Sequence, residues 1–166
     1  MVGPRMISFA ALPETVDAVK YVYDQVKSDP YMVTALAVSV LCNYKEDPEE
    51  TFQMIDVLKG PSPLSNFDKQ FIQERLKGKE YKPFSFIQGT SPANGYTVAA
   101  APYRIPVGKS ASQPVESNYC TMLVYSTGAD SPRSIMLRQK GGTEWCLTDI
   151  TILGDIRVPA AEDPWA

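Results

Sequence analysis

This 166-residue chain contains no histidine. The absence excludes Ser-His-Asp and Cys-His catalytic groups, most catalytic zinc sites and the usual general base near neutral pH. An enzyme made from this sequence would have to work with carboxylates, lysine, tyrosine or a thiol. We therefore predict neither a catalytic residue nor a cofactor, and we favour a function that is not enzymatic.

Cysteine is scarce. Cys42, Cys120 and Cys146 are far apart in the sequence and odd in number. This pattern indicates reduced thiols that serve as small apolar side chains, rather than a disulfide framework. We predict a cytoplasmic protein in which Cys120 and Cys146 lie on neighbouring strands.

A surplus of positive charge and a long apolar run are also missing. The net charge is -3 at pH 7, so there is no extended basic surface for a nucleic-acid backbone. The most apolar window, residues 31–42, is much shorter than the roughly 20 residues of a membrane-spanning helix. The N-terminal apolar run is short and is broken by Pro13, so this run is too weak for a secretory signal. We expect neither nucleic acid nor a membrane as a partner.

The composition that is present, 44% hydrophobic and 21% charged, is typical of a globular protein. Helix starts are well marked, because the dipeptide Asp-Pro at residues 29–30 and 47–48 joins an N-cap carboxylate to proline at the first helical position. Ser65 with Asp68 resembles a capping box. We predict helices over residues 14–27, 30–43, 48–59 and 66–77.

Apolar side chains recur at helical spacing within these segments. The first helix gathers its valines on one face, and residues 30–43 are apolar on nearly every side. We expect residues 30–43 to form the central element, with neighbours in several directions. Residues 66–77 present Phe67 and Phe71 beside Ile72, which predicts a surface helix with these side chains on its buried face.

Beyond Gly78 the pattern becomes that of strands. Residues 82–96 contain two prolines and an Asn-Gly pair, so we expect no helix there. In residues 131–150, SPRSIMLRQKGGTEWCLTDI, two runs of β-forming residues flank a Gly-Gly pair, which predicts a hairpin with Trp145 and Leu147 on its inward face. The predicted strands cover residues 96–101, 103–107, 119–126, 133–140 and 143–152.

Helices first and strands second predict an α+β fold. We expect an N-terminal four-helix layer packed on one face of a C-terminal antiparallel sheet of about five strands. A single domain, residues 1–166, would comprise a helical part at about 14–78, a connecting segment at 79–95 and a strand part at about 96–158.

Motifs that could carry chemistry are weak. The run GKSAS at 108–112 ends like a phosphate-binding loop, but Tyr103 stands where that motif needs glycine, so we interpret it as a loop between strands. Glu144, Asp149 and Asp155 could offer oxygens to a metal ion, yet the sequence has no ligand loop with alternating positions and a turning glycine. We interpret them as a solvated strand edge and predict no metal site.

The best candidate site is a set of aromatic and arginine side chains around the irregular middle of the chain. Aromatic rings with a polar tip suit contacts with a partner, and long loops often carry function. The alternative is that these rings cap the end of the core. Trp165, near the C-terminus, is expected to dock on its own domain. The set comprises Tyr81, Tyr96, Tyr103, Arg104 and Arg133, with Phe84 and Phe86 beside them.

Four longer phrases are distinctive. They are KGPSPLSNFDKQFIQERLKGKEYKP (59–83), NGYT (94–97), ADSPRSIMLRQKGGTEWCL (129–147) and DIRVPAAEDPWA (155–166). Through these phrases the chain resembles an uncharacterised family of small proteins from Gram-positive anaerobic bacteria, which is known as a domain of unknown function. The resemblance extends from about Leu12 to Trp165. The resemblance implies a bacterial cytosolic origin and one intact domain, and it implies no activity.

Two functions remain open. The first is a non-enzymatic module that binds an unknown protein partner through the 82–106 region or a concave end of the sheet. The second is a small-ligand carrier or an enzyme with a pocket between the helix layer and the sheet. A filled core would favour the first function, and an apolar cavity with a converging lysine or carboxylate would favour the second.

Overall fold

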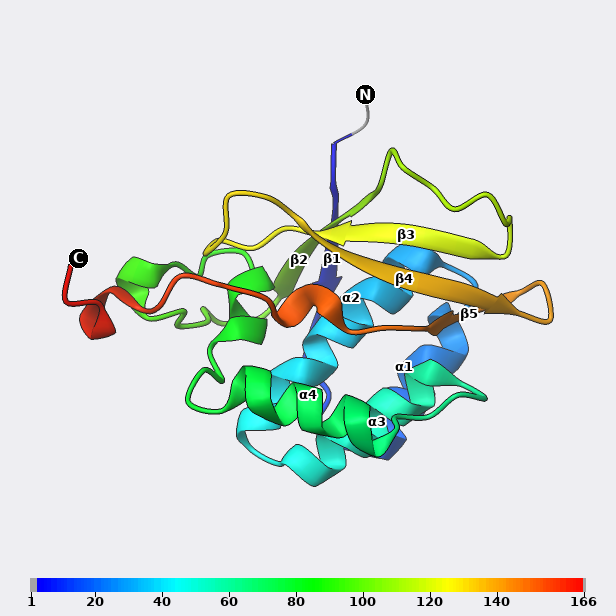
Figure 1. The fold of residues 1–166 in the computed structure, drawn as a ribbon, viewed down its shortest axis with the longest axis horizontal. Coiled ribbons are helices and arrows are strands. Elements are labelled where there is room, and N and C mark those ends of the chain that lie inside the picture. Colours follow the sequence, from blue (N-terminus) through cyan, green and yellow to red (C-terminus); the bar gives the residue numbers. More distant parts are fainter. Residues whose placement is uncertain (1–2, 166) are drawn as a thin grey trace.

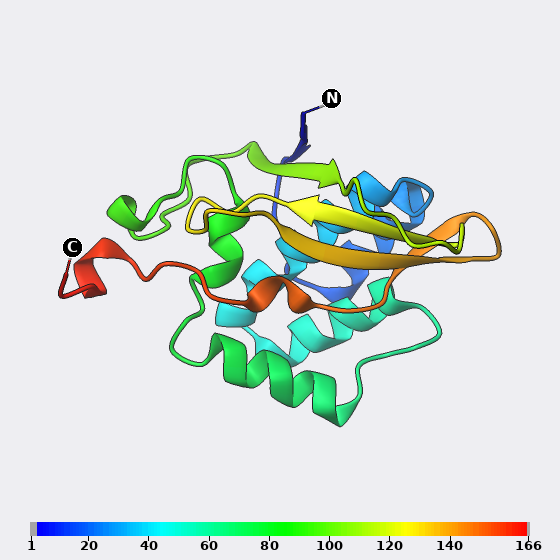
Figure 2. The same ribbon diagram turned by 45° about the horizontal axis from the view of Figure 1, so that its top comes forward.

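The computed structural model describes residues 3–165. Within them the chain forms an antiparallel five-stranded sheet in the order β1-β2-β3-β4-β5, with four α-helices on one of its faces (Figure 1, Figure 2). The predicted α+β fold is confirmed. The elements are β1 (Arg5–Phe9), α1 (Val16–Val26), α2 (Pro30–Leu41), α3 (Pro48–Lys59), α4 (Asn66–Leu76), β2 (Tyr103–Lys109), β3 (Tyr119–Val124), β4 (Arg133–Lys140) and β5 (Glu144–Leu147).

Helices α2, α3 and α4 begin where their caps predicted, whereas α1 begins at Val16 rather than at residue 14. The side chains of Asp29 and Asp47 each accept a backbone N–H of the helix that follows, and the capping box at Ser65 is present. Such bonds satisfy donors that a helix leaves without a partner in its first turn. Glu50, in the first turn of α3, also accepts the backbone N–H of Val16 at 2.9 Å. The start of α3 therefore holds the start of α1.

Helix α2 is the hidden centre of the fold. Its residues 33–41 are all buried. It contacts β1, β2, β3 and β5 of the sheet, and it also contacts α1 and α3, as predicted from its apolar surface. Among residues 3–165, no helix combines the length and the apolarity needed to cross a membrane.

The sheet presents one apolar face to the helices. Adjacent strands are in register, so inward side chains lie in rows across the sheet. Gly141 and Gly142, with φ of 61° and 76°, form the turn of the predicted β4–β5 hairpin. Trp145 is half-buried on the same face as Leu147, as predicted. The buried inward row includes Ile7, Ile105, Val107, Met122, Val124, Ile135, Leu137 and Leu147.

Three predictions about elements are wrong. Strand β1, which pairs with β2 at the sheet edge, was not predicted. Residues 96–101 are not a strand, because Tyr96 has a φ of 57°, which no β-strand allows. Residues 82–96, where we expected no helix, contain the short 3₁₀ helices Lys82–Phe86 and Pro92–Asn94. Proline is tolerated in the first turn of a helix, so it does not prevent them.

Three predictions about side chains are also wrong. Cys120 lies on β3 and Cys146 on β5, so β4 separates them. Phe67 is 77% exposed, because α4 turns Ile72 and Leu76 inward instead. Trp165 is 92% exposed rather than docked, since the last segment extends past the end of the sheet (Figure 1).

A substitution at Gly128 tests how closely this residue packs against Tyr96 and Ile156. A Cβ at Gly128 would lie 2.7 Å from Cγ2 of Ile156 and would press on the ring of Tyr96. Overpacking costs about 1–3 kcal/mol, so Gly128→Ala should lower the free energy of unfolding, measured in urea, by about 2 kcal/mol. Gly154→Ala is the matched control, because the nearest atom would be 3.9 Å away. Equal stability of the two variants would contradict this packing.

Candidate functional site

Tyr81 and Tyr96, two residues of the predicted site, meet in the structure. Their rings stack with centroids 5.2 Å apart and an angle of 6° between planes. The hydroxyl of Tyr81 donates to the carbonyl of Ile156 at 3.3 Å, and that of Tyr96 donates to the carbonyl of Arg157. Tyr96 is only 3% exposed. The pair fastens the C-terminal segment to the core.

The other three predicted residues lie elsewhere. Tyr103 and Arg104 are consecutive on β2, so their side chains point to opposite faces of the sheet. Tyr103 is half-buried on the helix-covered face, and Arg104 is exposed on the other. Arg133 begins β4, and its guanidinium donates to the carbonyl of Asp155. Arg133 thus joins Tyr81 and Tyr96 in holding residues 155–157, whereas Tyr103 and Arg104 lie apart from them. The binding role of the five residues stays a prediction.

A hollow of about 520 Å³ opens beside the stacked tyrosines. Its charged side chains have both signs: Lys45 on one side, Glu80 and Glu162 on the other. The ammonium of Lys45 lies 6.0 Å from the centre of the Phe84 ring. Because positive and negative groups are mixed, this hollow favours no particular ligand charge.

A second hollow, of about 610 Å³, opens between the α3–α4 connection and the β4–β5 hairpin. Its volume falls in the range of roughly 300–1,000 Å³ that is usual for ligand sites. We call it the cationic hollow. Its lining comprises Lys59, Pro61, Ser62, Tyr119, Met136, Arg138, Gln139, Lys140, Gly141, Cys146, Leu147 and Thr148.

Positive charge dominates the cationic hollow. Lys59, Arg138 and Lys140 line it, and its lining contains no Asp or Glu within residues 3–165. In the same part of the chain none of these cations forms an ion pair. Glu144 lies opposite Lys140 in the hairpin, but its carboxylate contacts the ammonium of Lys27 at 3.2 Å. The hollow therefore offers positive charge that no carboxylate of its own lining balances, although Asp149 lies close enough to Lys59 for their charges to attract.

Lys59 is the unusual member of this set. It is the last residue of α3 and is only 7% exposed. Its Nζ donates to the carbonyl of Thr148 at 3.0 Å, the one acceptor that the described residues give to its three N–H donors. Burying a charge costs free energy unless bonds or a counter-charge compensate. An anion in the hollow would supply both.

Arg138 and Tyr119 form an aromatic wall of the cationic hollow. They are paired directly across β3 and β4. The guanidinium carbon of Arg138 lies 5.4 Å from the centre of the Tyr119 ring, which is within the range of a cation–π contact. This contact orients the guanidinium at the rim of the hollow.

The opposite wall depends on Gly60. Its φ of 63° lets the chain leave α3 and turn beside β5. A Cβ at this position would lie 2.8 Å from Sγ of Cys146. The same thiol lies 3.5 Å from the hydroxyl of Tyr23. Burial raises the pKa of Tyr23 well above its ordinary value. The contacts of Gly60 and Tyr23 with Cys146 make this wall closely packed.

The cationic hollow was not predicted from the sequence. Arg138 and Lys140 are two residues apart on β4 and so share one face of the sheet, which the sequence pattern could have indicated. Lys59 gave no such signal, because a lysine in the last turn of a helix is ordinary. Its contact with Thr148 spans 89 residues of sequence.

These features define a class of protein: an α+β domain with helices on one face of a five-stranded sheet and a cationic hollow beside its last hairpin. The family described as Domain of unknown function (DUF6935) matches residues 11–160, and the chain belongs to this family. No match was found among curated proteins or among solved structures. The predicted membership of an uncharacterised family is confirmed.

The Tyr96 hydroxyl makes a testable contribution to stability. Burial raises the pKa of Tyr96 from 10.0 to about 12. The folded chain then keeps a proton that the unfolded chain releases, so this contribution is fully present below pH 10 and is lost as the pH rises towards 12. In Tyr96→Phe the loss of unfolding free energy between pH 8 and pH 11, measured in urea, should be smaller by about 1 kcal/mol. Identical pH profiles would contradict this assignment.

Proposed function

We propose that this protein is a non-enzymatic binding module whose ligand is an anion held in the cationic hollow. The observation that carries the proposal is that Lys59, Arg138 and Lys140 line one concave surface and form no ion pair within residues 3–165. Hydrogen bonds from arginine and lysine to carboxylate or phosphate oxygens are about twice as strong as neutral ones. A ligand anion would complete the partial hydrogen bonding of the buried Lys59 ammonium.

The cations would play different parts. Lys59 is a point charge held in place by Thr148, whereas Arg138 offers a planar fork that matches two oxygens of one anionic group. Lys140 is exposed at the end of β4 and would attract the ligand from solution. Although the chain has a net charge of -3, fields from distant charges are screened beyond about 8 Å at physiological ionic strength. The local charge therefore governs binding.

The lining of the hollow supports binding rather than catalysis. It offers cations, hydroxyls and an aromatic ring that suit an anion, and within residues 3–165 its lining has no carboxylate that could act as a general base beside the Cys146 thiol. A protein partner for the 82–106 region stays a second candidate, favoured by the exposed Arg104. Arg104→Ala would separate the two functions, since it lies outside the cationic hollow.

We also infer one domain in a cytoplasmic protein of a Gram-positive anaerobic bacterium. The single domain is supported by one continuous cluster of buried apolar residues. The cytoplasmic location is supported by the free, buried thiols of Cys42, Cys120 and Cys146, which are typical of reducing compartments. The bacterial origin is supported by the sequence phrases that resemble the family.

Inorganic phosphate is the simplest probe of the proposed site. Titrated into the labelled protein, it should cause saturable shifts in the amide resonances of residues 59–62 and 138–148. Arg138→Gln should weaken the apparent affinity at least fivefold, because losing one charge-assisted bond at an accessible site costs about 1 kcal/mol or more. Added sodium chloride should weaken binding in the parent protein.

Lys20→Gln is the matched control for this titration. Lys20 is an exposed lysine of α1 that does not line the cationic hollow. The variant has the same change of net charge as Arg138→Gln, and it should bind phosphate as the parent does. Equal weakening by both variants, or shifts that spread over the whole surface without saturation, would refute a specific anion site.

A further inference from the structure

A smaller hollow adjoins the cationic hollow. A hollow of about 200 Å³ lies between α4 and the chain that follows β5. Lys59 and Thr148 line both hollows, so the hydrogen bond between these two residues lies between the hollows. We call the smaller one the apolar groove. Its apolar lining consists of Leu64, Phe67, Phe71, Ile72 and Ile150.

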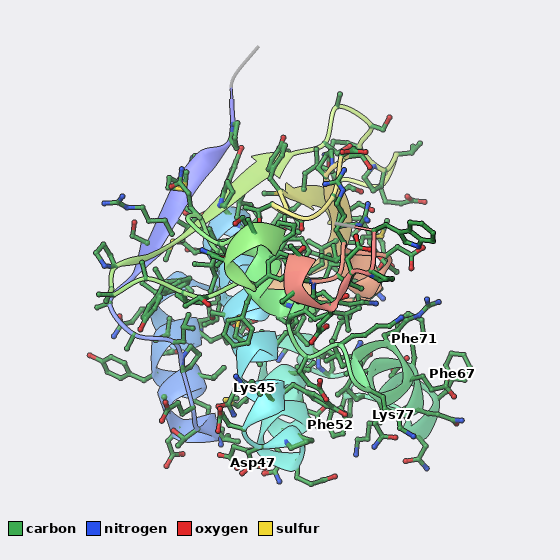
Figure 3. The ribbon with its side chains drawn as sticks, turned by 90° about the vertical axis from the view of Figure 1, so that its left-hand side faces the viewer. Lys45, Asp47, Phe52, Phe67, Phe71 and Lys77 are labelled. Carbon is green, nitrogen blue, oxygen red and sulfur yellow. The ribbon has the colours of Figure 1, made fainter. Side chains whose placement is uncertain are left out.

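Phe67 is the exposed edge of the apolar groove. It is 77% exposed, and Figure 3 shows it projecting outward from α4. Phe71 lies one helical turn further on the same face and is half-buried. A phenyl ring exposed beside a hollow that other apolar side chains line favours an apolar ligand group there. A volume of about 200 Å³ is enough for a short hydrocarbon group.

Negative charge flanks the apolar groove. Asp68 is oriented by the backbone N–H of Ser65 at 3.0 Å, and Asp149 accepts from the hydroxyl of Thr151 at 3.4 Å. Both carboxylates line the groove, whereas the cationic hollow has none among the described residues. A negatively charged group is therefore repelled at one end and attracted at the other. This polarity fixes the direction in which a two-part ligand would bind.

We propose that the ligand is an amphipathic anion: a phosphate or carboxylate head bound by Lys59 and Arg138, with a short hydrocarbon tail in the apolar groove beside Phe67. This rests on the proposed function and names its ligand class. The occupant is one molecule taken from solution, because the head site is concave and Lys59 is buried at its base. A flat membrane surface would not reach it.

Calorimetric titrations of inorganic phosphate and of octyl phosphate, below its micelle concentration, test the ligand class. Octyl phosphate should bind at least tenfold more tightly than phosphate, since full burial of two methylene groups is enough for that ratio. Phe67→Ser should remove most of this gain and leave phosphate binding unchanged. Arg138→Gln should weaken both ligands by a similar factor.

Controls separate the possible failures. Tyr21→Ser removes an equally exposed ring on α1, outside the groove, and should change neither affinity. Octylammonium has the same tail with a cationic head and should not compete with octyl phosphate. Absence of phosphate binding would refute the proposed function and this inference with it. Phosphate binding with no gain from the octyl chain, competition by octylammonium, or phosphate binding that is strengthened by phosphatidylglycerol vesicles but not by octyl phosphate would overturn the inference alone.

Discussion

The structure depends on one constraint: α2 is apolar on nearly every side, and each of those sides must be covered. The sheet covers one side, and α1 and α3 cover others. Because α2 occupies the space under the sheet, α4 packs against the turn Thr151–Leu153, beyond the end of β5. Both hollows lie where α3 and α4 pass beside β5 and the residues that follow it. Strand β5 is short, so it does not cover this side of the helices.

Much of this fold could be predicted from local signals. Proline and capping residues mark the starts of three helices, and the Gly-Gly pair marks the hairpin, since these features depend on neighbouring residues. Strand β1 could not be predicted with the same rules, because its partner β2 lies about a hundred residues away in the sequence. Residues 96–101 have the composition of a strand, but the turn that precedes Tyr96 puts its backbone in a left-handed conformation.

The candidate site was harder to predict than the fold. Aromatic residues in an irregular segment suggested a contact surface, and the structure places Tyr81 and Tyr96 against their own C-terminal segment. The cationic hollow is assembled from the end of α3, the β4–β5 hairpin and one residue of β3. The only signal of this hollow in the sequence is the spacing of Arg138 and Lys140, which puts both side chains on one face of β4. Burial of Lys59, its decisive feature, is a consequence of tertiary packing and has no local pattern.

The central claim is that an anion binds at the buried Lys59 ammonium. Anomalous diffraction from crystals soaked in arsenate, a heavy analogue of phosphate, tests it most directly. We predict an arsenate, located by its arsenic peak, whose oxygens lie within hydrogen-bond distance of both Nζ of Lys59 and the guanidinium of Arg138. Ordered arsenate found only at other positions, with the hollow unoccupied, would contradict it.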